Sequence, residues 1–131
     1  MKPEAKLWAK LSDYAKWRQD LYVERIENKI GAGMPDVLYH LPEYGKRGFI
    51  ELKVQTGKSL PHYTRAQRAW IKSRGDMSPG VFLLVKYIDT LYLYTHRQAN
   101  KLKGVKPGVE SGALWTGQGF GPFFVQALVM G

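Results

Sequence analysis

Two acidic residues and a lysine are the residues of this sequence best suited to catalysis. Asp36 follows Gly33-Met34-Pro35, and after fourteen intervening residues the chain reads Glu51-Leu52-Lys53. Side chains alternate between the two faces of a strand, so Glu51 and Lys53 would share one face while Leu52 and its neighbours Ile50 and Val54 face the core. If a hairpin joins the two segments, Asp36 can lie beside Glu51. Adjacent carboxylates repel each other unless a cation joins them, and all-oxygen ligation suits Mg²⁺ or Mn²⁺.

A basic stretch follows these residues directly. The chain has 20 Lys and Arg against 11 Asp and Glu, a net charge of +9, and it has no acidic residue between Leu52 and Gly75. This charge indicates a polyanionic partner, nucleic acid before membrane. The predicted phosphate contacts are Lys58, Arg65, Arg68 and Lys72. The last three recur at helical spacing and could follow a DNA backbone, although a solvated helix face would show the same pattern.

The surrounding pattern predicts the elements that must hold these residues. Apolar residues at three- and four-residue spacing predict a helix over 3–19. Thr64 and Gln67 form a capping-box pattern that predicts a helix over 65–74. We expect a further short helix over 97–103 and strands over 21–28, 37–39, 49–54, 81–87, 91–94 and 123–129, with 81–87 central in the sheet. The order favours an α/β fold with a mixed sheet.

Domain organisation follows from length and composition. Since 131 residues suit one compact domain and no composition break divides them, we expect a single domain over 1–131 with its core over about 3–95. The glycine-rich segment 104–121 is expected to be a loop that forms an arm or flap. The chain has no cysteine, which excludes disulfides and thiolate metal sites. No apolar run is long enough to span a membrane and no signal peptide is evident, so we expect a cytoplasmic protein without a membrane partner.

The residues with chemistry also resemble a known superfamily. Pro35-Asp36 with Glu51-Leu52-Lys53 resembles the PD-(D/E)xK nucleases. Gly33–Asp36, Ile50–Lys53 and Gln67–Ile71, followed by Gly75, are most similar to its virus-type replication-repair nuclease branch (VRR-NUC). Small phage nucleases and Holliday-junction resolvases are similar as well. The resemblance covers about residues 4–86 and implies a restriction-endonuclease-like core, a central mixed β-sheet flanked by helices.

The same resemblance implies roles for individual residues. Asp36 and Glu51 would hold Mg²⁺, for which Mn²⁺ could substitute, together with the backbone carbonyl of Leu52. Lys53 would orient the attacking water, and Gln67 would match the glutamine that these nucleases carry on the following helix; it would also complete the capping box. A further glutamate would complete the metal site, either Glu4 on the first helix or Glu27, with Glu24 as a weaker candidate. Glu4 is equally well explained as a favourable acid in a first helical turn.

These features together predict a Mg²⁺-dependent deoxyribonuclease that hydrolyses phosphodiester bonds. No base-reading motif is visible, so we expect it to select branched or junction DNA by structure, in bacterial or phage replication, recombination or repair. A homodimer is expected because the similar resolvases cut two strands symmetrically. Two alternatives remain at this stage: a catalytically inactive nucleic-acid-binding module, and a small sequence-specific restriction-type endonuclease.

Overall fold

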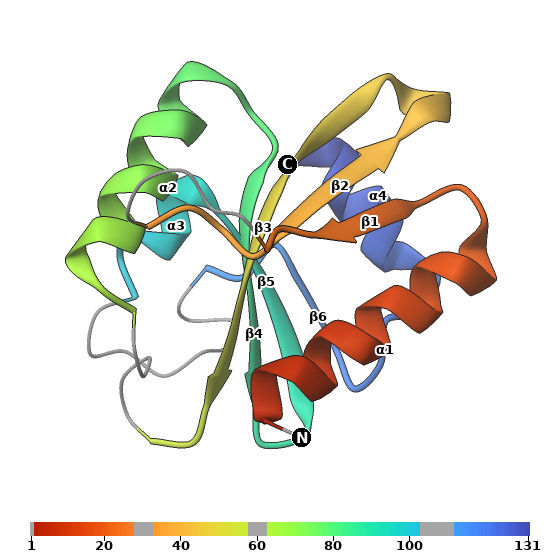
Figure 1. Ribbon diagram of the computed structural model, residues 1–131, viewed down its shortest axis with the longest axis horizontal. Coiled ribbons are helices and arrows are strands. Elements are labelled where there is room, and N and C mark those ends of the chain that lie inside the picture. The colour runs from red at the N-terminus through yellow and green to blue at the C-terminus, as the bar shows by residue number, and fades with distance from the viewer. Residues whose placement is uncertain (1, 28–32, 58–62, 103–111) are drawn as a thin grey trace.

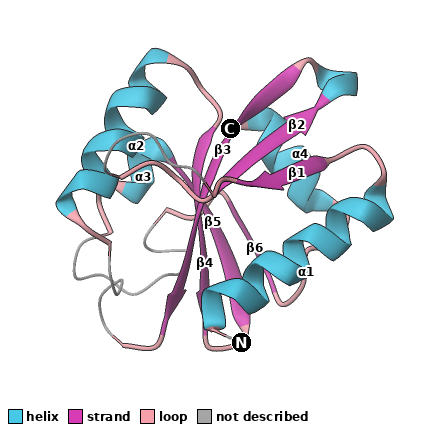
Figure 2. Ribbon diagram, viewed as in Figure 1, coloured by secondary structure: helices cyan, strands magenta, loops and turns pink. Residues whose placement is uncertain are grey.

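A mixed β-sheet forms the centre of the molecule (Figures 1 and 2). The computed structural model describes residues 2–27, 33–57, 63–102 and 112–131. Within them, six strands lie in chain order across the sheet. They are β1 (Tyr22–Arg25), β2 (Val37–Leu41), β3 (Lys46–Gln55), β4 (Val81–Tyr87), β5 (Thr90–Thr95) and β6 (Trp115–Gly117). β3 and β4 pair in parallel, and the other neighbours are antiparallel. The mixed sheet predicted from the sequence is confirmed.

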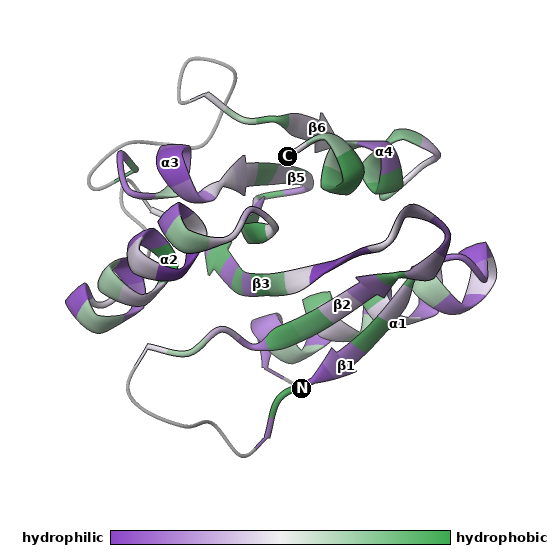
Figure 3. Cartoon of the chain, turned by 90° about the horizontal axis from the view of Figure 1, so that it is seen from above, coloured by the Kyte–Doolittle hydropathy of each residue, from purple (hydrophilic) through white to green (hydrophobic). Residues whose placement is uncertain are grey.

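Helices cover both faces of this sheet. Helices α1 (Pro3–Arg18) and α4 (Phe123–Met130) pack on one face, and α2 (Arg65–Met77) and α3 (His96–Ala99) pack on the other (Figure 1). A short 3₁₀ turn, η1 (Pro42–Tyr44), joins β2 to β3. Seen from above in Figure 3, α2 and α3 lie together on one side of the sheet, with α3 beside β5, and hydrophilic residues alternate with hydrophobic ones around α2. None of the helices in the described ranges is both long and apolar enough to cross a membrane.

Each face of the sheet has its own apolar core. Ile50 and Leu52 of β3 pack with α1 and α4, whereas Leu83 and Val85 of β4 pack with α2 and α3. Five consecutive residues of β4, Val81–Val85, are buried because both of their faces are covered. The predicted central strand over 81–87 is therefore confirmed. From the sequence, only the Leu52 face of β3 was expected to pack against the protein interior. The second core shows that the face bearing Glu51 is covered as well.

The end of the chain differs from the sequence prediction. Residues 123–130 form helix α4 and not a strand. A continuous apolar run does not distinguish the two, but Phe123, Gln126 and Met130 are exposed while Phe124 and Leu128 are buried, which is a helical period. The predicted loop over 104–121 is also wrong in part, because Trp115–Gly117 pairs with β5 as strand β6. Residues 103–111 of that segment lie outside the described residues.

Several element ends also shift from their predicted positions. The predicted strand over 21–28 is limited to Tyr22–Arg25, while β2 and β3 are longer than predicted. The helix expected over 97–103 begins at His96 and ends at Ala99. The first helix matches its prediction closely, with Pro3 in its first turn, where a missing N–H costs nothing.

Candidate active site

Asp36 and Glu51 face each other across the β2–β3 hairpin. The register pairs Val37, the first residue of β2, with Ile50, so Asp36, directly before β2, lies beside Glu51. The backbone N–H of Leu52 donates a hydrogen bond to Oδ2 of Asp36, with a distance of 3.1 Å. The carboxylate of Asp36 is therefore held by the same strand that carries Glu51.

Glu51 and Lys53 lie on the α2 side of β3 and are almost completely enclosed. Their exposed fractions are 1% and 3%, and their parallel neighbours on β4 are Leu83 and Val85. Burying an isolated charge in an apolar cluster is very unfavourable, whereas opposite charges that share the site reduce this cost for each other. The structure thus places a carboxylate and an ammonium side chain on one face, with Cα atoms about 7 Å apart along the strand.

The segment before Asp36 fixes its entry into the sheet. Gly33 has a φ of +85°, a conformation that glycine adopts at little cost, and Pro35 is buried. The backbone carbonyl of Asp36 accepts a hydrogen bond of 2.8 Å from the N–H of Ile26, which follows β1. Both the main chain and the side chain of Asp36 are therefore tied to neighbouring strands.

Gln67 lies in the first turn of α2 and completes the predicted capping box. The N–H of Thr64 donates to Oε1 of Gln67 at 2.9 Å, and the N–H of Gln67 donates to Oγ1 of Thr64 at 3.1 Å. The capping prediction is confirmed. The amide oxygen of Gln67 accepts in the cap, and its amide nitrogen could donate to a substrate.

The further metal-binding glutamate is not brought to the pair. Glu4, Glu24 and Glu27 are all exposed. Glu4 lines a hollow with Arg25, Val54 and Thr56, beyond the Lys53 end of the site. In the described part of the chain, no three His, Cys, Asp or Glu side chains cluster closely enough to hold a metal ion. The structure therefore brings together Asp36 and Glu51 but none of the three candidates for the third carboxylate.

The predicted cationic stripe on α2 is divided in the structure. Arg65 is exposed, whereas the guanidinium of Arg68 lies 5.0 Å from the centre of the Tyr63 ring. Lys72 forms an exposed ion pair of 2.9 Å with Asp76, the first acidic residue after Glu51. That i, i+4 spacing is readable from the sequence. Lys58 lies outside the described residues.

Tyr63 is a neighbour of the site that the sequence analysis missed. It is 6% exposed and belongs to the same apolar cluster as Leu83 and Val85. Burial raises the pKa of Tyr63 above its ordinary value; Arg68 lowers that pKa and the charge of Glu51 raises it further. Tyr63 directly precedes the N-cap and Arg68 is the fourth helical residue, so their contact has the spacing of a hydrophobic staple, which could have revealed it.

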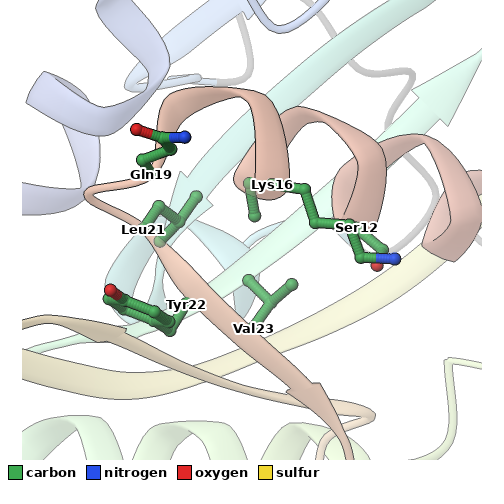
Figure 4. Close-up of a pocket in the computed structure, with 7 residues that line it drawn as sticks. Ser12, Lys16, Gln19, Leu21, Tyr22 and Val23 are labelled. Carbon is green, nitrogen blue, oxygen red and sulfur yellow. The ribbon is translucent and has the colours of Figure 1, made fainter.

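A hollow on the α1 side of the sheet lies away from these charges (Figure 4). Ser12 and Lys16 from α1 line it together with Leu21, Tyr22 and Val23 from the start of β1. Val23 pairs with Tyr39, which faces the core beneath α1 and not the carboxylate pair. This hollow therefore belongs to a different surface from the candidate active site.

Comparisons with known proteins point to a fold. No protein-family model matches the sequence, and no curated protein matches it either. The chain is similar to a solved structure of Hjc, a Holliday junction resolvase from the archaeal hyperthermophile Archaeoglobus fulgidus. The TM-score is 0.53 and the sequence identity is 13%, over 72% of this chain and 78% of the resolvase chain. With its mixed sheet flanked by helices, the chain has the α/β, restriction-endonuclease-like fold expected from its sequence.

Proposed function

We propose that this protein is a divalent-metal-dependent DNA nuclease of the PD-(D/E)xK type, and that it selects branched or junction DNA by structure. The observation that carries the proposal is the placement of Asp36 opposite Glu51, with Lys53 on the same face. The similarity in fold to an archaeal Holliday junction resolvase supports it. Assignment to the VRR-NUC branch, and a place in bacterial or phage DNA metabolism, are part of the same proposal.

The donor set fits a magnesium ion. Asp36 and Glu51 offer carboxylate oxygens, which Mg²⁺ and Mn²⁺ prefer, and the sequence has no cysteine to supply a thiolate. The N–H and C=O of one strand residue point to the same side, and the N–H of Leu52 points to Asp36. The carbonyl of Leu52 therefore turns toward Asp36 as well. Asp36, Glu51 and this carbonyl would hold the ion, which neutralises phosphoryl charge and lowers the pKa of a bound water when present.

Two side chains of the protein would act on the DNA beside the metal ion. Lys53 would orient the attacking water and balance the charge that builds on the phosphoryl oxygens in the transition state. Its position beside Val85 inside the apolar cluster excludes bulk water, which strengthens such an interaction. Arg65 would contact the phosphate backbone, which positions DNA without reading its sequence. A homodimer would give two such sites, one for each strand.

The test compares branched, duplex and single-stranded DNA with the purified protein in Mg²⁺, Mn²⁺ or EDTA. Cleavage is expected in either metal, to be lost in EDTA, and to be strongest on branched DNA. Asp36→Asn and Glu51→Gln should lose metal binding, measured by calorimetry, together with cleavage. Cleavage that persists in EDTA would contradict the metal site, and cutting at one fixed duplex sequence would favour a restriction-type enzyme.

A nucleic-acid-binding module is the second candidate. It is favoured by one observation: no third acidic side chain joins Asp36 and Glu51 among the residues that the structure describes. A module of this kind would bind the same DNA through its basic surface and show no cleavage in any metal.

A further inference from the structure

A second hollow lies on the α2 side of the sheet, beside the carboxylate pair. Its volume is about 230 Å³, and its lining comes from β2, β3, the end of α2 and the start of β4. The side chains that define it are Leu38, Phe49, Arg47 and Arg74. No Asp or Glu is among the described residues that line it. We call this hollow the Arg74 groove.

The strand register connects this groove to the candidate active site. Side chains on one face recur at every second residue, so two cross-strand pairs, Leu38 with Phe49 and His40 with Arg47, share the α2 face with Glu51. Asp36, directly before β2, continues this series by its parity. Exposure increases along this series, from the enclosed Glu51 through half-buried Phe49 to exposed Arg47. The distance along β3 from Glu51 to Arg47 is about 14 Å at the usual rise of a strand. The groove therefore leads from solvent toward the two carboxylates.

Phe49 of β3 lines the groove, and Trp70 of α2 packs behind it. Phe49 and Trp70 meet edge to face, with ring centres 5.1 Å apart and an interplanar angle of 82°. The guanidinium of Arg74 lies 5.0 Å from the centre of the Trp70 ring and 5.9 Å from that of Phe49. Arg74 is exposed, so its guanidinium packs on aromatic surface and remains accessible from solvent.

The positive charge of this groove is available to a ligand. In the described ranges of the chain, neither Arg47 nor Arg74 forms an ion pair, whereas Lys72 on the same helix is paired with Asp76. Glu24, which pairs with Leu38, is the acidic residue on this face of β1 and stands at the edge of the sheet. A groove with unpaired arginines and a stacking surface combines the two features that bind single-stranded nucleic acid.

We propose that the Arg74 groove binds an unpaired segment of the DNA strand that leads to the Asp36–Glu51 pair. Arg47 and Arg74 contact its phosphates, and one base stacks on the guanidinium plane that Trp70 supports. This inference rests on the proposed nuclease function and adds the form of DNA that the site receives. A duplex offers phosphates but no free base face, so a stacking surface is useful only where the strand is unpaired.

Binding in EDTA tests the groove without cleavage. The probes are a fluorescein-labelled ten-nucleotide oligothymidine and an abasic strand of the same length, followed by fluorescence anisotropy at several salt concentrations. Arg47→Ala and Arg74→Ala should each weaken oligothymidine binding about tenfold. Each should also lower the slope of log affinity against log salt by about 0.7. Lys16→Ala removes one exposed charge from α1 on the opposite side of the sheet and is the matched control.

A conservative variant separates stacking from charge. Arg74→Lys keeps the positive charge but lacks the guanidinium plane, so it should keep the salt slope of the wild type and lose the preference for oligothymidine over the abasic strand. A wild type without such a preference would overturn the stacking site. Arg47→Ala and Arg74→Ala proteins that bind like Lys16→Ala would overturn the whole groove, and a larger loss in Arg65→Ala would then place the strand along α2.

The outcomes for the groove and for the nuclease are distinguishable. A wild type that binds oligothymidine through Arg47 and Arg74 but cuts no DNA in Mg²⁺ overturns the proposed nuclease and supports the groove. A wild type that cuts branched DNA while Arg47→Ala and Arg74→Ala bind normally supports the nuclease and overturns the groove.

Discussion

Gly33 lies directly against the carbonyl of Ala66, in the first turn of α2. A Cβ placed on Gly33 would overlap that carbonyl and would lie 2.8 Å from the backbone nitrogen of Gln67. The segment that leads into Asp36 is therefore in close contact with the helix that carries Gln67 and Arg74. This contact fixes the segment before Asp36 against the first turn of α2.

Gly33→Ala should consequently destabilise the protein by about 2 kcal/mol or more, through a positive φ and a collision with backbone atoms. Gly45→Ala is the matched control, because Gly45 also has a positive φ, +59°, but no heavy atom lies within 4 Å of an added Cβ. It should cost about 1 kcal/mol. Urea unfolding of both variants measures the difference. Equal losses of unfolding free energy in the two variants would show that the backbone at residue 33 can move away from Ala66 at no cost.

Lys53→Met tests catalysis by the buried ammonium group. Methionine has a similar length, so the variant avoids the cavity that alanine would leave at this enclosed position. Single-turnover cleavage should fall about 100-fold, as expected for the loss of one preorganised electrostatic group, while metal affinity changes little. Lys46→Met is the control on the same strand, since the Nζ of Lys46 donates to the carbonyl of Val129 on the opposite face. A wild-type rate in Lys53→Met would contradict a catalytic role for this ammonium group.

Two buried tyrosines make a matched pair for a stability test. The hydroxyl groups of Tyr39 and Tyr63 are both enclosed and make no hydrogen bond with any described residue. Removing an unpaired buried hydroxyl is neutral or favourable, so Tyr39→Phe and Tyr63→Phe should each keep or raise the free energy of unfolding, by up to about 1 kcal/mol. Thermal denaturation checks this. A loss of more than about 1 kcal/mol in Tyr63→Phe alone would show that its hydroxyl has a partner near Glu51.

Acid should weaken the end of α1. The side chain of Arg18 donates from Nε and Nη2 to the two carboxylate oxygens of Asp20, at 3.0 and 2.8 Å. These hydrogen bonds hold the pKa of Asp20 below its ordinary value, so the pair stabilises the fold above about pH 4 and loses that effect as pH falls through the folded-state pKa.

Asp20→Asn should therefore lower the free energy of unfolding by about 0.5–1 kcal/mol at pH 7, and the difference from wild type should shrink toward pH 3. Asp13→Asn, on an exposed part of α1, is the control for loss of charge. Urea unfolding at pH 7, 5 and 3 gives the comparison. A difference that stays constant from pH 7 to pH 3 would contradict a role for the ionised pair.

The hairpin that carries Asp36 and Glu51 could be predicted from the sequence, because strand alternation and turn residues are local signals. The strand β4 and the Thr64–Gln67 cap could be predicted for the same reason. The burial of Glu51 and Lys53 could not be predicted, since it depends on α2 packing on a face that looked polar. The Arg74 groove combines residues from β2, β3 and α2 whose proximity exists only after folding. The error at α4 came from a different cause, an apolar run read as a strand despite its helical period.

The placement of both carboxylates on one hairpin also bears on how the chain folds. Asp36 and Glu51 are fifteen residues apart along the chain, so their contact closes a short loop with a small loss of chain entropy. The pairing of β3 with β4 is parallel and requires the whole crossover through α2, which raises the contact order on that side. The carboxylate pair can thus assemble early, whereas the Arg74 groove is complete only after the slower crossover has docked. Folding kinetics would then separate the two halves of one site, although they lie side by side in the finished molecule.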